Sequence, residues 1–129
     1  MFDSFDTVNS LVKIATGVVD TLKLNSENMK KALSVDLLAT DLAYYLVRKS
    51  VPFRLAHSLS GQCVSLAEKL KCNLNDLTLA QLKEISEHFD SDVKEVYDFE
   101  KSVEQYSSIG GTAQSSVLEQ IKYFKIKFC

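Results

Sequence analysis

The sequence has few of the residues that a turn-rich β fold or a disulfide-linked protein needs. Its 129 residues include only 4 glycines and 1 proline, and this scarcity of turn formers favours helices. The 3 cysteines are odd in number and irregularly spaced, without a C-x-x-C motif. We therefore expect neither a disulfide framework nor a zinc site, and predict free thiols in a reducing compartment. Cys63 is expected in the core and Cys129 at the exposed end, while the reactivity of Cys63, Cys72 and Cys129 stays open.

An excess of one charge sign is also missing. The chain has 15 Lys+Arg, 17 Asp+Glu and a formal net charge of -2, which argues against partners such as nucleic acid or anionic membranes. No apolar run approaches the about 18 residues of a transmembrane helix. The acidic start, Met1–Asp6, lacks the basic and apolar regions of a signal peptide. A cytoplasmic location is therefore expected.

Apolar residues at helical spacing are what the sequence has instead. Over residues 2–22 they recur every three or four positions, which predicts one long amphipathic helix. Its stripe consists of Phe2, Phe5, Val8, Leu11, Val12, Ala15, Val18, Val19 and Leu22. No N-terminal cap precedes this helix, so we expect part of it to lie upstream of Met1.

Shorter helices are predicted for the middle of the chain. Asn25 or Ser26 can cap a short helix over 27–33, and Ser34 can cap a helix over 35–49. Pro52 fits the first turn of a helix that runs to about residue 71. The side chains expected to be buried on the last two helices are Leu38, Leu42, Tyr45, Leu46, Phe53, Ala56, Ser60, Cys63, Val64 and Ala67.

Helices are also predicted after residue 77. Thr78-x-x-Gln81 has the form of a capping box, and Asp90 or Ser91 can start a helix through residue 97. Glycines at 110–111 interrupt the chain before a last helix capped by Thr112. No repeat and no long alternating segment demands a sheet. The predicted fold is therefore all-α, with a long bundle helix followed by a small helical C-terminal domain.

Two histidines are the first candidates for chemistry. His57 could act as a general acid or base if a partner lies within hydrogen-bond reach; otherwise it is a structural histidine satisfied by a neighbouring helix. His88 lies near Glu84 and Glu87 at a helix end, where it can cap the helix or interact with its dipole. The histidines are far apart and form no H-E-x-x-H motif, so no metal site is expected.

A buried carboxylate and a glycine turn are the remaining candidates. Asp41 lies between apolar positions of its helix, with Arg48 one heptad further on. If buried, it needs a cation or a hydrogen-bond donor, and an interhelical ion pair is the expected solution. Gly110-Gly111-Thr112 can be an anion cradle or a tight interhelical turn. Ser115 and Ser116 add hydroxyls there, but the sequence places no base beside them.

Several unbroken strings resemble the argininosuccinate lyase family. They are L-A-T-D-L-A-Y-Y-L-V-R-K at 38–49, V-P-F-R at 51–54, A-H at 56–57 and S-G at 60–61. S-V-E-Q-Y at 102–106, G-G-T-A at 110–113, S-S-V at 115–117 and A-T-G-V at 15–18 are similar to the same family. The resemblance runs in register over essentially the whole chain. The delta-crystallins carry the same strings.

The resemblance implies a homotetramer in the fumarase/aspartase superfamily, built around a central helical bundle. Residues 1–33 then correspond to the end of that bundle and residues 34–129 to the lyase C-terminal domain. The family reaction cleaves argininosuccinate to arginine and fumarate, a step of arginine biosynthesis and the urea cycle, and no cofactor is implied. Ser50 lies where the family usually has glycine; if its φ is positive, serine costs about 1 kcal/mol.

The family's catalytic loop, G-S-S-x-M-P-x-K-x-N, does not occur in this sequence. No catalytic, substrate-binding or metal residue is carried over, and neither His57 nor Ser115 nor Ser116 matches one. The chain alone is therefore expected to be inactive, as a C-terminal fragment or truncated paralogue. Alternatives are a crystallin-like structural protein, or a module that docks on full-length lyase subunits. An uncovered stripe over residues 2–12 would indicate a missing partner.

Overall fold

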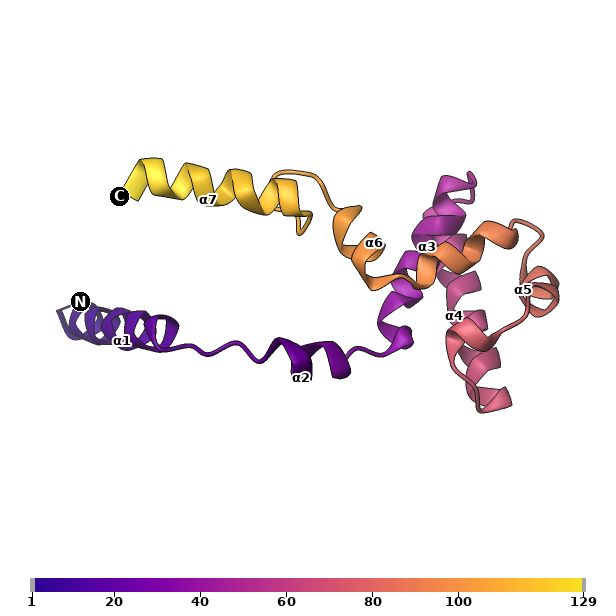
Figure 1. Ribbon diagram of the computed structural model, residues 1–129, viewed down its shortest axis with the longest axis horizontal. Coiled ribbons are helices and arrows are strands. Elements are labelled where there is room, and N and C mark those ends of the chain that lie inside the picture. Colours follow the sequence, from indigo (N-terminus) through magenta and orange to yellow (C-terminus); the bar gives the residue numbers. More distant parts are fainter. Residues whose placement is uncertain (1, 129) are drawn as a thin grey trace. The chain divides into compact units, whose positions relative to one another are not determined.

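The computed structural model describes residues 2–128, and in those residues it contains helices and connecting segments but no strand (Figure 1). The predicted all-α fold class is therefore confirmed. The chain divides into two compact units, residues 1–33 and residues 34–129. Each unit is described by itself. Within residues 2–128, no helix combines the length and the apolar character that crossing a membrane requires.

The first unit consists of two helices and has no core of its own. Helix α1, Phe2–Asp20, and helix α2, Ser26–Lys31, bury no residue. The long predicted helix is present, although it ends two residues before Leu22. Asn25 caps α2 as expected, because its side-chain oxygen accepts a hydrogen bond of 3.0 Å from the backbone N–H of Asn28. Helix α2 begins one residue earlier and ends two residues earlier than predicted.

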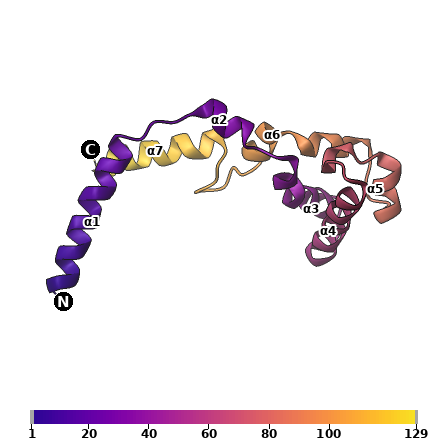
Figure 2. The ribbon, with the colours of Figure 1, turned by 90° about the horizontal axis from the view of Figure 1, so that it is seen from below.

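The second unit is built on two packed helices, α3, Ala39–Arg48, and α4, Phe53–Leu70, which lie side by side in both views (Figures 1 and 2). Helix α5, Leu79–Ile85, packs against α4. Small residues on the inner face of α4 allow the close approach, and the Ser60 hydroxyl donates a hydrogen bond of 2.6 Å to the backbone oxygen of Ala39. The predicted stripes are buried at Leu38, Leu42, Tyr45, Leu46, Ala56, Ser60, Cys63 and Ala67. Val64 is half-buried.

Phe53 is an exception to the predicted core. Its side chain is 54% exposed, because the first residue of α4 lies beyond the end of the packed face. The ring lies beside Tyr44 and His57, with centroid distances of 6.1 and 6.3 Å. Pro52 directly precedes α4 instead of lying in its first turn.

Ser34 does not cap the next helix with its side chain, contrary to expectation. A 3₁₀ turn, η1, spans Val35–Leu38 before α3, and no side-chain capping bond is formed at Ser34. The backbone oxygen of Ser34 accepts instead, from the N–H of Leu37 at 3.1 Å. A hydrogen bond between residues i and i+3 is typical of a 3₁₀ turn. The acceptor is therefore the backbone oxygen of Ser34, whereas the prediction had its side-chain hydroxyl as the acceptor.

Helices α3 and α4 end in the same way, with a residue in the left-handed conformation. Ser50 has φ 70° and Lys71 has φ 53°. After α3, Ser50 N–H bonds to the Val47 oxygen at 2.9 Å and Val51 N–H bonds to the Leu46 oxygen at 3.1 Å. This pair of bonds is a Schellman motif, in which glycine is the preferred left-handed residue. Serine was expected to be unfavourable at position 50 only if its φ is positive. The structure shows that this φ is positive.

The second unit contains further helices in addition to this pair. They are η2 (Leu74–Asp76), α5 (Leu79–Ile85), η3 (Ser91–Tyr97), α6 (Phe99–Glu104) and α7 (Gln114–Phe128). The predicted capping box is confirmed: Gln81 N–H donates to the Thr78 hydroxyl at 3.3 Å, and Thr78 N–H donates to the Gln81 side chain at 2.8 Å. Leu74, Leu77, Leu82, Phe89 and Val93 complete the core.

One predicted helix start is confirmed in position and another is wrong. A helix does begin at Ser91 and run to Tyr97, but it is the 3₁₀ helix η3, and the Asp90 side chain makes no capping bond. Asp98 caps the following helix α6, because its carboxylate accepts from the N–H groups of Glu100 and Lys101 at 2.9 and 3.1 Å. Thr112 does not cap α7, contrary to expectation, since its hydroxyl donates to the Val103 backbone oxygen at 3.1 Å.

Cys63 is fully buried, as predicted, and burial raises the pKa of its thiol to about 12. Such a thiol stays protonated at neutral pH and is a poor nucleophile. Cys72 is half-buried, and both are free. Cys129 lies outside the described residues. Cys63 is therefore a core residue, not a reactive one.

Candidate functional site

A surface pocket of about 420 Å³ lies between α3, η3 and α6. It is lined by Asp41, Tyr45, Arg48, Asp92, Glu95, Val96, Lys101, Ser102 and Gln105. Most of these side chains belong to two hydrogen-bonded groups, and Glu95 and Lys101 form a separate ion pair. The Asp41 network comprises Asp41, Arg48, Ser102, Gln105 and Tyr106. The Tyr45 network comprises Tyr45, Lys49, Lys83, Asp90 and Asp92.

The Asp41 network satisfies a buried carboxylate with neutral donors. Asp41 is 5% exposed and accepts three hydrogen bonds, from the Ser102 hydroxyl at 2.5 Å, the Gln105 amide at 2.6 Å and the Tyr106 hydroxyl at 2.8 Å. A buried carboxylate needs such partners, because burial without them is costly. Hydrogen-bond donors therefore satisfy Asp41, and the interhelical ion pair that was expected is absent from the described residues. Arg48 donates instead to the Gln105 side-chain oxygen at 2.9 Å.

Tyr106 remains a donor in this network over the ordinary pH range. Burial, and then the hydrogen bond to Asp41, raise the pKa of its hydroxyl to about 12. Ser102, Gln105 and Tyr106 were not predicted as partners of Asp41. Their spacing could have indicated this role, because positions 102, 105 and 106 lie on one face of a helix. A helix face with three polar side chains can supply the hydrogen-bond donors that a buried aspartate needs.

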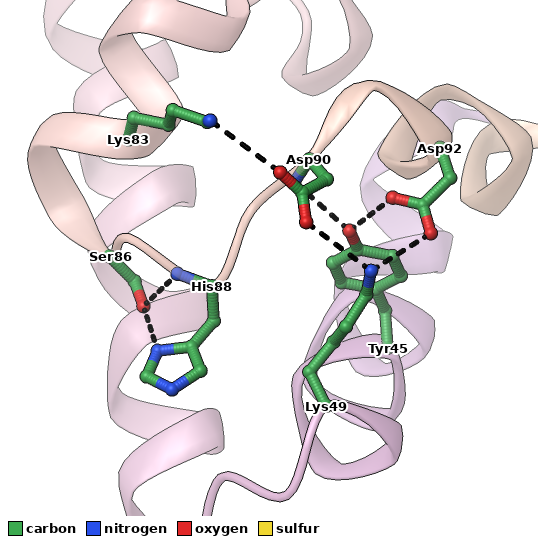
Figure 3. A network of polar contacts seen from close by, with 7 residues as sticks. All are labelled: Tyr45, Lys49, Lys83, Ser86, His88, Asp90 and Asp92. Atoms are coloured by element: carbon green, nitrogen blue, oxygen red, sulfur yellow. Dashed lines mark hydrogen bonds and ion pairs between the residues drawn. The ribbon is translucent and has the colours of Figure 1, made fainter.

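The Tyr45 network joins α3 to η3 and α5 (Figure 3). The Tyr45 hydroxyl donates to Asp92 at 2.5 Å and accepts from the backbone N–H of Asp90 at 3.0 Å. The ammonium of Lys49 lies 3.1 Å from Asp92 and 3.5 Å from Asp90, and that of Lys83 lies 3.5 Å from Asp90. The three ion pairs are largely solvent-exposed, so each contributes little to stability.

The pKa shifts in the Tyr45 network follow its hydrogen bonds and its burial. The bond from Tyr45, and then the neighbouring Lys49, lower the pKa of Asp92. Burial, and then the bond to Asp92, raise the pKa of Tyr45. The same carboxylate raises the pKa of Lys49. Each group is therefore held in the protonation state that keeps the network together at neutral pH.

The two histidines do not take part in this pocket. His57 is exposed, lies beside the Phe53 ring, and makes no hydrogen bond among residues 2–128. His88 lies beyond the end of α5, where its ring nitrogen is 3.2 Å from the Ser86 hydroxyl. Because it follows the last turn by three residues, it does not cap the helix, contrary to one expectation.

The glycine turn is an interhelical turn whose helix start is already occupied. The Glu104 carboxylate accepts from the N–H of Gln114, the first residue of α7, at 3.1 Å. The Glu104 carboxylate therefore occupies the helix start at which an external anion would bind if the turn were an anion cradle. Gly111 is required in this turn, because a Cβ there would lie 2.1 Å from the backbone oxygen of Tyr106. Ser115 is exposed, and Ser116 is buried.

The pocket is built to hold helices together. Of its acidic side chains, Asp41 has three donors, Asp92 binds Tyr45 and Lys49, and Glu95 pairs with Lys101 at 2.9 Å. A general base would need an available carboxylate or imidazole here. Within the described residues, no three His, Cys, Asp or Glu side chains are grouped as a metal site requires. What the arrangement can do is fix η3 and α6 against α3.

Comparison with known proteins gives a single family. A family model described as "Argininosuccinate lyase C-terminal" matches residues 36–104. The argininosuccinate lyase of Candida albicans is 49% identical over 126 residues, which cover 97% of this chain and 27% of that protein. The argininosuccinate lyase of Chlamydomonas reinhardtii is 52% identical over 122 residues, covering 95% of this chain and 26% of that protein. The chain thus spans about a quarter of the length of the curated relatives it matches.

Proposed function

Because the chain belongs to the argininosuccinate lyase family and corresponds to its C-terminal portion, we propose that it serves as the non-catalytic C-terminal part of an argininosuccinate lyase. The family reaction forms arginine and fumarate from argininosuccinate, in arginine biosynthesis and the urea cycle. Residues 1–33 are the end of the central helical bundle in this proposal, and residues 34–129 are the C-terminal domain. The proposed location is the cytoplasm.

One observation carries the proposal: identity to the Candida albicans lyase of 49% extends over 97% of the chain. The catalytic loop motif of the family does not occur in these 129 residues. The pocket between α3, η3 and α6 also supports a structural role, since its carboxylates are held by Ser102, Gln105, Tyr106, Tyr45 and lysines. The chain by itself is therefore inactive in this proposal.

The proposed partners are other lyase subunits, as a homotetramer of the family type or through docking on full-length subunits. Helix α1 supports this, because Phe5, Val8, Val12, Ala15 and Val19 follow the alternating three- and four-residue spacing of a helical bundle. None of α1 is buried, and Phe2, Phe5 and Val8 are 86%, 71% and 57% exposed. Uncovered apolar surface of this extent favours a missing partner. A crystallin-like role has only the shared strings in its favour.

A graft tests the proposal. The corresponding C-terminal portion of the Candida albicans lyase is replaced by this chain, and fumarate formation from argininosuccinate is measured. We expect the graft to keep kcat/KM within about tenfold of the parent, a change of ~1.4 kcal/mol in transition-state stabilisation. The isolated chain should form no fumarate above a mock preparation.

Two results would contradict the proposal. Fumarate formation by the isolated chain would place catalytic groups within these 129 residues. A graft that assembles normally and is inactive would show that the chain does not substitute for a lyase C-terminal portion. A graft that carries the parent's own C-terminal residues, cut and rejoined at the same position, is the matched control.

A further inference from the structure

Residues 99–128, here called the C-terminal arm, contribute almost nothing to the hydrophobic core. The core cluster ends at Val93. Ala113 is the one apolar side chain buried in the described part of the arm, and it is not a member of that cluster. The apolar side chains of α7 are exposed, with Ile121 at 44% and Phe124 at 54%. Apolar burial therefore does not explain why the arm keeps its place on the second unit.

Hydrogen bonds to one carboxylate do explain it. Asp41, on α3, accepts from Ser102 on α6, from Gln105 and from Tyr106, at 2.5 to 2.8 Å. Gln105 also accepts from Arg48 at 2.9 Å. The other polar tie between the arm and the preceding elements is the pair of Lys101 with Glu95, whose side chains are 59% and 70% exposed. An exposed pair of this kind holds little, whereas hydrogen bonds to a buried charge are strong.

The arm is tied to itself by bonds of its own. The Thr112 hydroxyl donates to the Val103 oxygen, the Gln114 N–H donates to Glu104, and Ala113 N–H donates to the Tyr106 oxygen, each at 3.1 Å. These bonds join α6, the glycine turn and the start of α7. Whatever moves the α6 end of the arm therefore moves the turn and α7 with it.

We infer that Asp41 is the positioning residue of the C-terminal arm, and that the arm opens as one cooperative unit while the α3–α4 pair stays folded. Local opening of this type follows from few apolar contacts and a small number of polar anchors. The Asp41 carboxylate sets where the exposed apolar face of α7 points. This opening is a property of the chain's own stability and does not depend on the proposed lyase role.

Hydrogen–deuterium exchange of the full chain tests the inference through Asp41→Asn. The asparagine amide has the size of the carboxylate but no charge. Its NH2 group donates hydrogen bonds and therefore cannot accept from the three donors that contact Asp41. We expect the amides of residues 99–128 to exchange at least about tenfold faster, and those of α4 to stay within about twofold of wild type. Asp92→Asn is the matched control, because it cuts the other network on α3; its effect should be confined to η3.

A milder variant keeps the test decisive if Asp41→Asn unfolds the whole chain. Ser102→Ala removes one of the three donors and leaves the carboxylate in place. It should speed exchange of the arm by a smaller factor and leave α4 unchanged. Equal acceleration of the arm and α4 by Ser102→Ala, or no acceleration of the arm by either variant, would overturn the inference.

Discussion

Helices α1 and α4 are nearly equal in length, 19 and 18 residues, and both carry apolar residues at helical spacing. Their surroundings are opposite. Helix α4 buries Ala56, Ser60, Cys63 and Ala67 against the rest of its unit, whereas α1 buries nothing. The apolar periodicity therefore predicts the helix and the face that can be buried. Whether that face is buried depends on other segments.

The kind of apolar residue separates the two helices further. The inner face of α4 is made of small side chains, which suit close packing on one neighbour. The stripe of α1 consists mainly of larger ones, including Phe5 at 71% and Leu11 at 58% exposure. Large side chains spread widely around a helix suit burial among several helices. This difference supports the proposal that α1 belongs to a bundle of subunits.

The largest expected effect breaks the core of the second unit. Leu46 is fully buried, and Leu46→Ala should lower the free energy of unfolding by about 2–5 kcal/mol, because it leaves a cavity. Leu11→Ala, the same substitution at a side chain 58% exposed on α1, should cost under about 0.5 kcal/mol in the chain alone. Urea unfolding followed by far-UV circular dichroism measures both, since both units are helical. Equal losses would contradict the comparison.

Tyr97 offers a stabilising change in the second unit. Its hydroxyl is buried and has no hydrogen-bond partner in the described part of the chain. Tyr97→Phe removes that unsatisfied group and should raise the free energy of unfolding by about 1 kcal/mol. Tyr123→Phe, at a side chain 55% exposed, is the control and should change little. A loss of stability in Tyr97→Phe would mean that the hydroxyl is engaged.

Ser50 allows a smaller gain at the end of α3. Its φ of 70° is the left-handed conformation that glycine adopts without penalty. Ser50→Gly should raise the midpoint of thermal unfolding, by a stability gain of about 0.5–1 kcal/mol, and Ser50→Ala should give none. Lys71→Gly repeats the change at the matching end of α4, where φ is 53°. A destabilised Ser50→Gly would show that the hydroxyl matters more than the backbone.

A pH dependence of stability is also expected, on the alkaline side. The folded-state pKa of Tyr106 is raised to about 12, above the ordinary value of about 10 for tyrosine. The folded chain therefore holds this proton more tightly than the unfolded chain, and the stabilisation is complete below about pH 10 and lost as pH rises toward 12. Tyr106→Phe should flatten that decline in urea unfolding series. An unchanged slope would contradict the assignment.

Local rules predicted much of this fold. The capping box of Thr78 and Gln81, the cap of Asn25 and the buried stripe through Leu42 and Leu46 depend on residues within a few positions of one another. Ser50 lies where the family usually has glycine, which indicated that its φ could be positive, and the structure has this positive φ.

Long-range partners could not be predicted in the same way. Asp41 finds its donors more than 60 positions along the chain, and the α7 start is capped by Glu104 from another helix. Nothing local to Arg48 indicates that Gln105 replaces Asp41 as its partner. The 3₁₀ geometry of η1 and η3 likewise reflects packing against α3 more than the sequence of either segment.

The native mass of the full chain tests the central claim most directly, that α1 is uncovered because its cover belongs to other subunits. Sedimentation should give a tetramer for the wild type and a monomer for Val8→Asp/Val12→Asp, which places charges on the stripe. Leu118→Asp on α7, at the same 58% exposure as Val12, should leave the tetramer intact. A monomeric wild type would contradict the homotetramer, and a tetramer that survives the charges on α1 would contradict the role of the stripe.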